Sequence, residues 1–151
     1  MSDFDVKEKR FEEDIEDYLI HHGGYIKGDP KKFNRESGLD EDTFVEFIKT
    51  SQPKKWDRYV KIYAENSEKQ VVERFKREVK TTNLLNVMRH GFMDRGIKLY
   101  PIFWKPETTL NETTQIQYDA NILHCTRQLH YSVHNENSID IVLFVNGIPV
   151  V

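Results

Sequence analysis

The last fifteen residues of the chain constrain its fold more than any other segment. Residues 141–145 are an unbroken apolar run, which is typical of a strand that is covered on both faces. Asn146-Gly147 follows, and this dipeptide favours a two-residue β-hairpin because both turn positions need a positive φ. A regular hairpin places Val145 opposite Ile148 and Leu143 opposite Val150. We therefore expect the chain to close on a sheet.

A single acid, Asp140, stands at the start of this hairpin. The same register places it opposite a position about two places past Val151. A hairpin that carries Asp on one strand, and an acid and a lysine on the other, gathers the oxygen ligands that Mg²⁺ prefers. Asp140 is therefore a candidate catalytic and metal-binding residue. The alternative is an Asp at a strand end that binds the backbone of a turn.

Composition limits the class of protein. The chain has 151 residues, a size that favours one domain over residues 1–151. No apolar stretch approaches the roughly twenty residues of a membrane span, and the first residues lack a signal-peptide pattern. Cys125 is the single cysteine, so an internal disulfide cannot form. A soluble cytoplasmic protein is therefore expected. The net charge of −3 argues against a stand-alone nucleic-acid binder, so any DNA contact must be local or supplied by other parts. No phosphate-binding loop of the Walker type is present, which excludes an ATP site of that kind.

Hydrophobic periodicity predicts an α+β fold, with helices first and strands after about Gly96. The first expected helix covers 11–20. The second follows Asp40 and stops before Pro53, and the third begins at Pro53 with Trp56, Val60 and Tyr63 inward. The fourth begins at a capping box of Ser67 and Gln70, and the fifth covers 84–90. The expected strands cover 97–104, 116–124, 127–133 and the closing hairpin, with a polar loop over 105–114.

Charged residues near these elements are further candidates. In the first helix, apolar positions 11, 15, 18 and 19 form one stripe that should face the core, with Glu12 and Glu16 at its border. Arg127 and Gln128 precede a polar strand near Asp140 and are candidates for DNA contact or for support of the site. Arg127 could bind a carboxylate or a phosphate, or simply stabilise a surface strand, and the sequence does not choose between these roles.

Several segments together resemble a known family. Residues 121–132, 137–140 and 144–150 are similar to the start of the R (restriction and motor) subunit of type I restriction enzymes. Residues 11–19, 22–25, 50–53 with Trp56, and 86–92 extend the similarity upstream in the same order. The resemblance covers nearly the whole chain.

The resemblance implies a restriction-endonuclease-like nuclease domain of the PD-(D/E)xK kind, which here would be cut within its central hairpin. Asp140 matches the family's metal-binding Asp, and an acid and a lysine are expected about three and five places past Val151. Glu12 stands where related chains carry a helix acid, although Glu13 and Glu16 remain open. The chain alone is expected to be inactive because the acid and the lysine are missing.

The resemblance also implies cofactors and partners. Mg²⁺ would serve the complete nuclease domain, whereas ATP would bind only in motor domains of the parent protein. The expected partners are double-stranded DNA and the modification and specificity subunits of the same complex, in the cytoplasm of a bacterium or archaeon, with no membrane. An alternative is a helical docking module for the modification enzyme, with Trp56, Tyr59 and Tyr63 as aromatic anchors.

Overall fold

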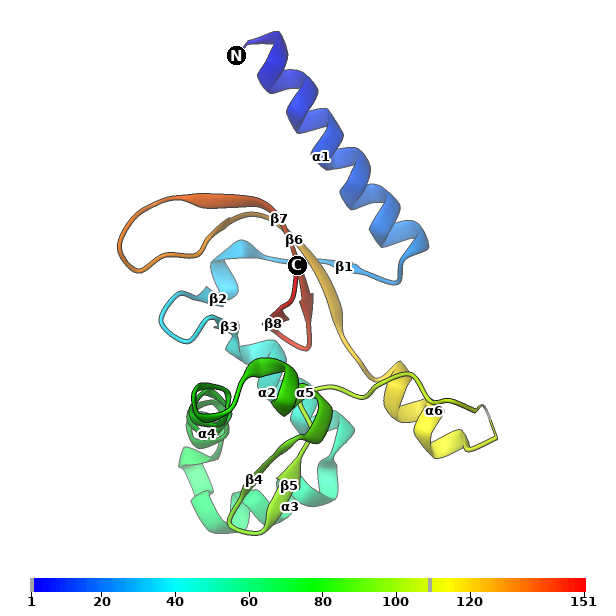
Figure 1. Ribbon diagram of the computed structural model, residues 1–151, viewed down its shortest axis with the longest axis vertical. Helices are drawn as coiled ribbons and strands as arrows, with labels where there is room; N and C mark the ends of the chain where they lie inside the picture. The colour runs from blue at the N-terminus through cyan, green and yellow to red at the C-terminus, as the bar shows by residue number, and fades with distance from the viewer. Residues whose placement is uncertain (1, 109) are drawn as a thin grey trace. The chain divides into compact units, whose positions relative to one another are not determined.

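The computed structural model describes residues 2–108 and 110–151 and divides into two compact units. Unit 1 holds Met1–Asp40 and Ile122–Val151, and unit 2 holds Glu41–Asn121. Helices come first and the main sheet last, so the expected α+β arrangement is confirmed (Figure 1). The elements in chain order are α1 (Asp3–His22), β1 (Ile26–Lys27), η1 (Pro30–Lys32), β2 (Phe33–Asn34), β3 (Leu39–Asp40), α2 (Glu41–Ser51), α3 (Pro53–Tyr63), η2 (Ala64–Asn66), α4 (Ser67–Thr81), α5 (Leu84–His90), β4 (Phe92–Asp94), β5 (Ile97–Leu99), α6 (Glu112–Asp119), β6 (Leu123–His130), β7 (Ser138–Val145) and β8 (Ile148–Pro149).

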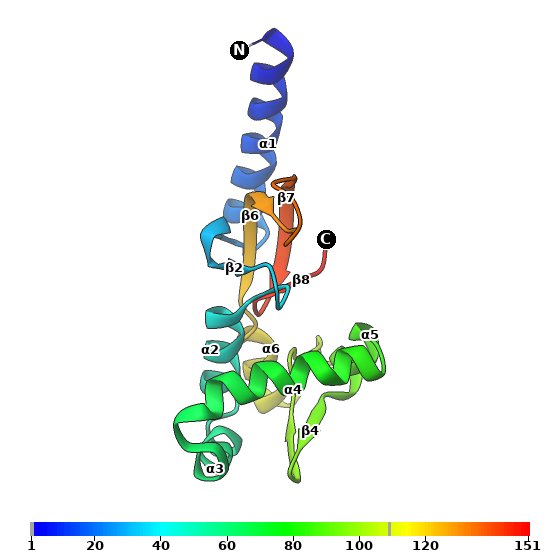
Figure 2. The same cartoon turned by 90° about the vertical axis from the view of Figure 1, so that its left-hand side faces the viewer.

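Unit 1 is built on a four-stranded sheet of order β1-β6-β7-β8. β1 runs parallel to β6, and the other pairs are antiparallel. The long β6–β7 ladder runs from Leu123 opposite Val145 to His130 opposite Ser138 (Figure 2). Leu129, Val142 and Phe144 form a buried cluster on this ladder, with Phe33 packed against it. The ladder therefore fixes where Asp140 lies.

The closing hairpin forms as the sequence predicts, with Val145 opposite Ile148. Asn146 and Gly147 have φ values of 52° and 79°, which is the left-handed conformation that the Asn-Gly turn requires. Beyond the turn, Val150 N donates to Leu143 O, and Leu143 N donates to Val151 O. Two residues thus lie opposite Leu143, which is the bond pattern of a β-bulge. A bulge shifts the register of the following positions by one residue.

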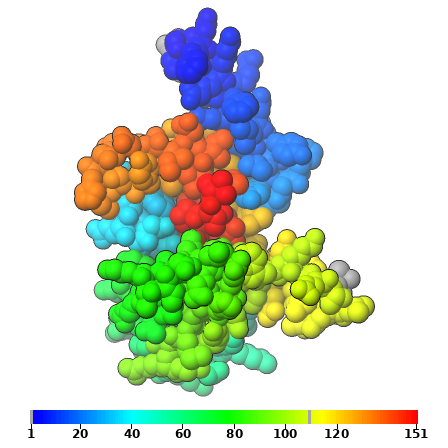
Figure 3. All heavy atoms as spheres, in the orientation of Figure 1, coloured from blue at the N-terminus to red at the C-terminus, as the bar shows by residue number. Residues whose placement is uncertain are grey.

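Helix α1 is rotated about its axis relative to the orientation that its apolar stripe predicts. Phe11 and Tyr18 are 66% and 65% exposed, whereas Glu12 and Glu16 are only 7% and 6% exposed. Ile15 and Leu19 are half-buried, so only part of the expected stripe faces the core. β6 brings Arg127 to Glu12, and this partly buried ion pair favours the orientation that buries the acids. The N-terminal end of α1 projects from unit 1 (Figure 3).

Unit 2 is a helical cluster in which α2, α3 and α4 pack against one another, and the β4–β5 hairpin packs against α3 and α4. Phe44, Phe47 and Ile48 of α2 are fully buried, as expected. In α3, Trp56 and Tyr59 point inward, but Val60 is 38% exposed, so the predicted inward position of Val60 is wrong. Tyr59 takes the inward position instead of Val60 because its hydroxyl donates to the buried carboxylate of Asp94 at 2.9 Å.

Other predicted boundaries also differ from the structure. Residues 112–119 form helix α6, and one strand, β6, replaces the two predicted over 116–124 and 127–133. Asn111 begins this helix by accepting a hydrogen bond from Thr113 N at 3.0 Å. The strand expected over 97–104 ends at Leu99, before Pro101. At the start of α4, the Ser67 hydroxyl donates to Ala64 O instead of forming the predicted capping box. Among residues 2–108 and 110–151, no helix is long and apolar enough to cross a membrane.

Candidate metal centre

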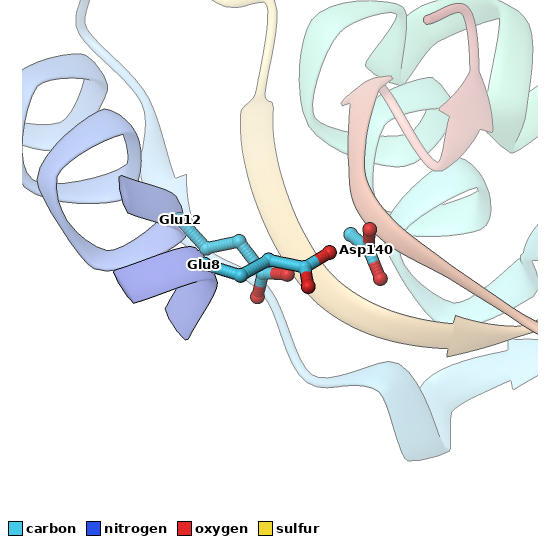
Figure 4. Close-up of side chains that lie close together, drawn as sticks. All are labelled: Glu8, Glu12 and Asp140. Carbon is cyan, nitrogen blue, oxygen red and sulfur yellow. The ribbon is translucent and has the colours of Figure 1, made fainter. Parts of the chain in front are cut away.

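Three carboxylates from distant parts of the chain meet in unit 1. Glu8 and Glu12 lie four residues apart, so they project from the same face of α1. Asp140 lies on β7 and points toward them (Figure 4). One carboxylate oxygen of each residue can be chosen so that all three oxygens lie within 4.8 Å of one another. The geometry therefore gathers three anionic oxygen donors around one point.

Strand β6 supplies the groups that hold Glu12. Arg127 Nη2 lies 3.1 Å from Glu12 Oε2, and Gln128 Nε2 donates to the same oxygen at 3.2 Å. Gln128 Nε2 also lies 3.5 Å from Asp140 Oδ1. Arg127 and Gln128 thus fix Glu12 and link it to Asp140.

The backbone of Gln128 explains how two successive residues reach one carboxylate. Neighbouring side chains on a strand normally point to opposite faces of the sheet. Gln128 has a φ of 54°, the left-handed conformation that non-glycine residues rarely adopt, and this breaks the alternation between Arg127 and Gln128. Backbone strain of this kind costs about 1 to 3 kcal/mol and is concentrated at functional sites.

The carboxylates line an open pocket of about 320 Å³. Its lining residues are Asp5, Glu8, Lys9, Glu12, Arg127, Gln128 and Asp140. Four acids and two bases give the pocket an excess of negative charge, which attracts a cation. The volume is enough for about ten waters, so a hydrated ion fits together with a further oxygen ligand.

The donor set suits a hard divalent cation. Mg²⁺ binds carboxylate oxygens and water, usually through one or two carboxylates, and keeps part of its hydration shell. Zinc favours sulfur and nitrogen donors, and the three residues of this cluster offer only oxygen. The residues present therefore fit Mg²⁺, or Mn²⁺ as its usual substitute.

The structure separates the residues that the sequence singled out. It brings Asp140 and Glu12 together, and it turns Arg127 toward a carboxylate. Glu13 Oε1 lies 4.0 Å from Arg127 Nη1, and Glu13 is not part of the cluster. Glu16 is buried outside the cluster, and its Oε2 has no hydrogen-bond partner among the residues that the structure describes.

Sequence reasoning missed Glu8. It had a usable signal, since Glu8 precedes Glu12 by four residues and must share its helix face. That signal was hidden by the assumption that the apolar stripe of α1 faces the sheet.

Comparison with known proteins gives one family match. The model of the family described as the type I restriction enzyme R protein N terminus matches residues 5–151. No curated protein and no solved structure gives a significant match. The matched range includes all the residues of the carboxylate cluster.

Proposed function

Because the chain belongs to the type I restriction enzyme R protein N-terminal family, we propose that it forms part of a nuclease domain that hydrolyses DNA with the help of Mg²⁺. The convergence of Glu8, Glu12 and Asp140 carries this proposal. In that role, the two units belong to one nuclease domain, and the carboxylates bind the metal.

Each residue of the cluster has a distinct part. Asp140 and Glu8 are exposed and offer oxygens to the ion, whereas Glu12 is buried and oriented by Arg127. Gln128 keeps Glu12 and Asp140 at a fixed separation through its amide group. A bound Mg²⁺ would polarise a phosphoryl oxygen and lower the pKa of a water ligand.

The family resemblance implies an acid and a lysine on the strand that follows the Asn146-Gly147 turn. Residues 141–151 contain neither an acid nor a lysine. The bulge opposite Leu143 shifts the register by one, so a strand that continued past Val151 would face Asp140 about three places on instead of two. The family resemblance assigns the acid to that place. We therefore propose that this chain binds the metal but does not hydrolyse DNA by itself.

The wider proposals follow from the family. Double-stranded DNA is the substrate, the modification and specificity subunits are partners, and ATP serves only motor domains of the parent protein. The alternative of a docking module based on α3 is less favourable, because Trp56 and Tyr59 are 8% and 0% exposed. The third expected anchor, Tyr63, is half-buried, and its hydroxyl donates to Asp94 at 2.8 Å.

Titration calorimetry with MgCl₂ tests the metal proposal. We expect the wild-type chain to bind one ion, Asp140→Ala to lose that binding, and Asp14→Ala, which removes an exposed acid from α1, to retain it. Equal binding by all three proteins would contradict the proposed site.

A cleavage assay with plasmid DNA and Mg²⁺ tests the proposed inactivity. We expect no cleavage by the 151-residue chain. Robust cleavage that Asp140→Ala abolishes would refute this part of the proposal while supporting the metal site.

A further inference from the structure

A second pocket, of about 330 Å³, lies in unit 2 at the start of α3. The end of α2, the first turn of α3, the segment after β5 and α6 contribute to its walls. The lining residues are Ser51, Gln52, Pro53, Lys54, Lys55, Tyr100, Phe103 and Gln117. No acid is among them, in contrast to the pocket of unit 1. Its chemistry therefore favours an anion.

Two cations line this pocket, and two more lie near Lys55. Lys54 and Lys55 line it, and Arg58 and Lys98 are close enough to Lys55 to lower the pKa of its ammonium group, an effect that adds to the larger one of burial. None of the four forms an ion pair in the part of the chain that the structure describes. Lys49, Arg74 and Lys76 of the same unit pair instead with Glu68, Glu78 and Glu73, respectively. The positive charge at the pocket is therefore uncompensated, and a bound anion would relieve the mutual repulsion.

The pocket has a fixed aromatic wall. Gln52 is buried, and its amide group donates to Tyr100 O at 2.9 Å and accepts from Tyr100 N at 2.8 Å. The rings of Tyr100 and Phe103 lie 6.0 Å apart, and Lys55 Nζ lies 4.9 Å from the centre of the Tyr100 ring. An aromatic surface beside ammonium groups is typical of nucleic-acid sites, where the phosphate meets the cations and the sugar or base packs on the ring.

The first turn of α3 adds to the positive potential. Gln52 occupies the N-cap position without forming a side-chain cap, and Pro53 has no N–H, so the first turn offers the backbone N–H groups of Lys54 and Lys55. This helix end reinforces the four cations and would not by itself hold an anion.

We propose that the pocket at the start of α3 binds a backbone phosphate of DNA and makes unit 2 a DNA-contacting part of the chain. This inference rests on the proposed function, because it takes DNA as the substrate. It also reconciles DNA binding with the net charge of −3, because the phosphate contact is confined to one local cluster of cations.

DNA binding by the double variant Lys54→Gln/Lys55→Gln tests the proposal. Fluorescence anisotropy with a labelled duplex, over a series of KCl concentrations in EDTA, measures affinity without the metal site. Loss of one phosphate contact should lower the salt slope by about one and the affinity about eightfold near 0.1 M salt. The control Lys69→Gln/Lys80→Gln removes two exposed lysines of α4 and should leave both nearly unchanged. Circular dichroism and the urea midpoint verify that both variants fold.

Three results would overturn the proposal. They are no DNA binding by the wild-type chain, equal losses in the two double variants, or an unchanged salt slope in Lys54→Gln/Lys55→Gln. Titration with inorganic phosphate separates the two sources of the anion. Phosphate binding that the variant loses while its DNA affinity is unchanged would assign the pocket to a small anion and refute the DNA contact.

A Mg²⁺ titration of the same proteins keeps this test separate from that of the metal site. Lys54→Gln/Lys55→Gln should bind Mg²⁺ as the wild type does. Failure of Mg²⁺ binding in the wild type would contradict the metal centre and leave the DNA result standing.

Discussion

Removing the charge of Asp140 should stabilise the chain in the absence of metal. Three carboxylates can bring oxygens within 4.8 Å of one another, and among residues 2–108 and 110–151 only Glu12 of the three has a cation within ion-pairing distance. Asp140 meets two like charges, and the amide of Gln128 lies 3.5 Å from its Oδ1. Asp140→Asn keeps the shape and the amide contact and removes this repulsion.

The size of the effect follows from Coulomb's law. Two unit charges 4.8 Å apart repel by about 0.9 kcal/mol in water, and two such pairs are screened by about 0.1 M salt to roughly 1 kcal/mol in total. A bound ion reverses the sign. At 10 mM Mg²⁺ and a dissociation constant of about 1 mM, linkage stabilises the wild type by about 1.4 kcal/mol, and Asp140→Asn loses this gain.

Urea denaturation in EDTA and in 10 mM Mg²⁺ measures both effects. We expect Asp140→Asn to be more stable than the wild type in EDTA and insensitive to Mg²⁺. Asp14→Asn is the matched control, because it removes an exposed charge from α1 outside the pocket and should respond to Mg²⁺ as the wild type does.

Two results would refute this reasoning. If Asp140→Asn is less stable than the wild type in EDTA, the carboxylates do not repel as the geometry requires. If Mg²⁺ stabilises Asp140→Asn and the wild type equally, the ion binds elsewhere.

Two further predictions concern buried polar contacts. Glu12→Gln should lower the free energy of unfolding by about 1 kcal/mol, because the loss of roughly 2 kcal/mol from leaving the Arg127 guanidinium without its closest partner exceeds the gain of roughly 1 kcal/mol from removing the repulsion with Glu8 and Asp140. Glu13→Gln should change it by less than about 0.5 kcal/mol. Urea denaturation in EDTA measures both effects, and equal effects would contradict the assigned pairing. Tyr59→Phe should lower the free energy of unfolding by about 2 kcal/mol, because it removes the hydrogen bond to the buried carboxylate of Asp94. Burial, and then Asp94, raises the pKa of the Tyr59 phenol and so keeps it a hydrogen-bond donor. An unchanged thermal midpoint would rule out this contact as a source of stability.

Local sequence signals predicted the elements that depend on local geometry. Asn146-Gly147 sets the hairpin because the turn itself demands a positive φ at both positions, and α2 buries Phe44 and Phe47 as its periodicity indicates. The strand expected over 97–104 was too long, because β5 ends at Leu99, before Pro101, a residue that strands admit only at an edge or a bulge. In these places the physics is contained in a few adjacent residues.

Tertiary contacts decided the remainder. The burial of Glu12 on α1 depends on Arg127, which lies more than a hundred residues away, so periodicity alone did not show which face of the helix is most buried. The left-handed conformation of Gln128 and the bulge opposite Leu143 have no signature in the sequence, yet they set which groups meet Glu12 and which position would face Asp140. Asp140 and Glu12 were predicted as members of one site, but the contribution of Glu8 could be seen only once the buried face of α1 was known.

A crystal structure of the chain soaked in Mn²⁺ tests the central claim most directly. Anomalous scattering locates the ion independently of any assay of activity. We predict one peak bounded by Glu8, Glu12 and Asp140, with carboxylate oxygens about 2.2 Å away, as expected for a hard divalent cation. A soaked crystal with no peak there, or with peaks only at other acids, would contradict the assignment of these three residues as a metal centre.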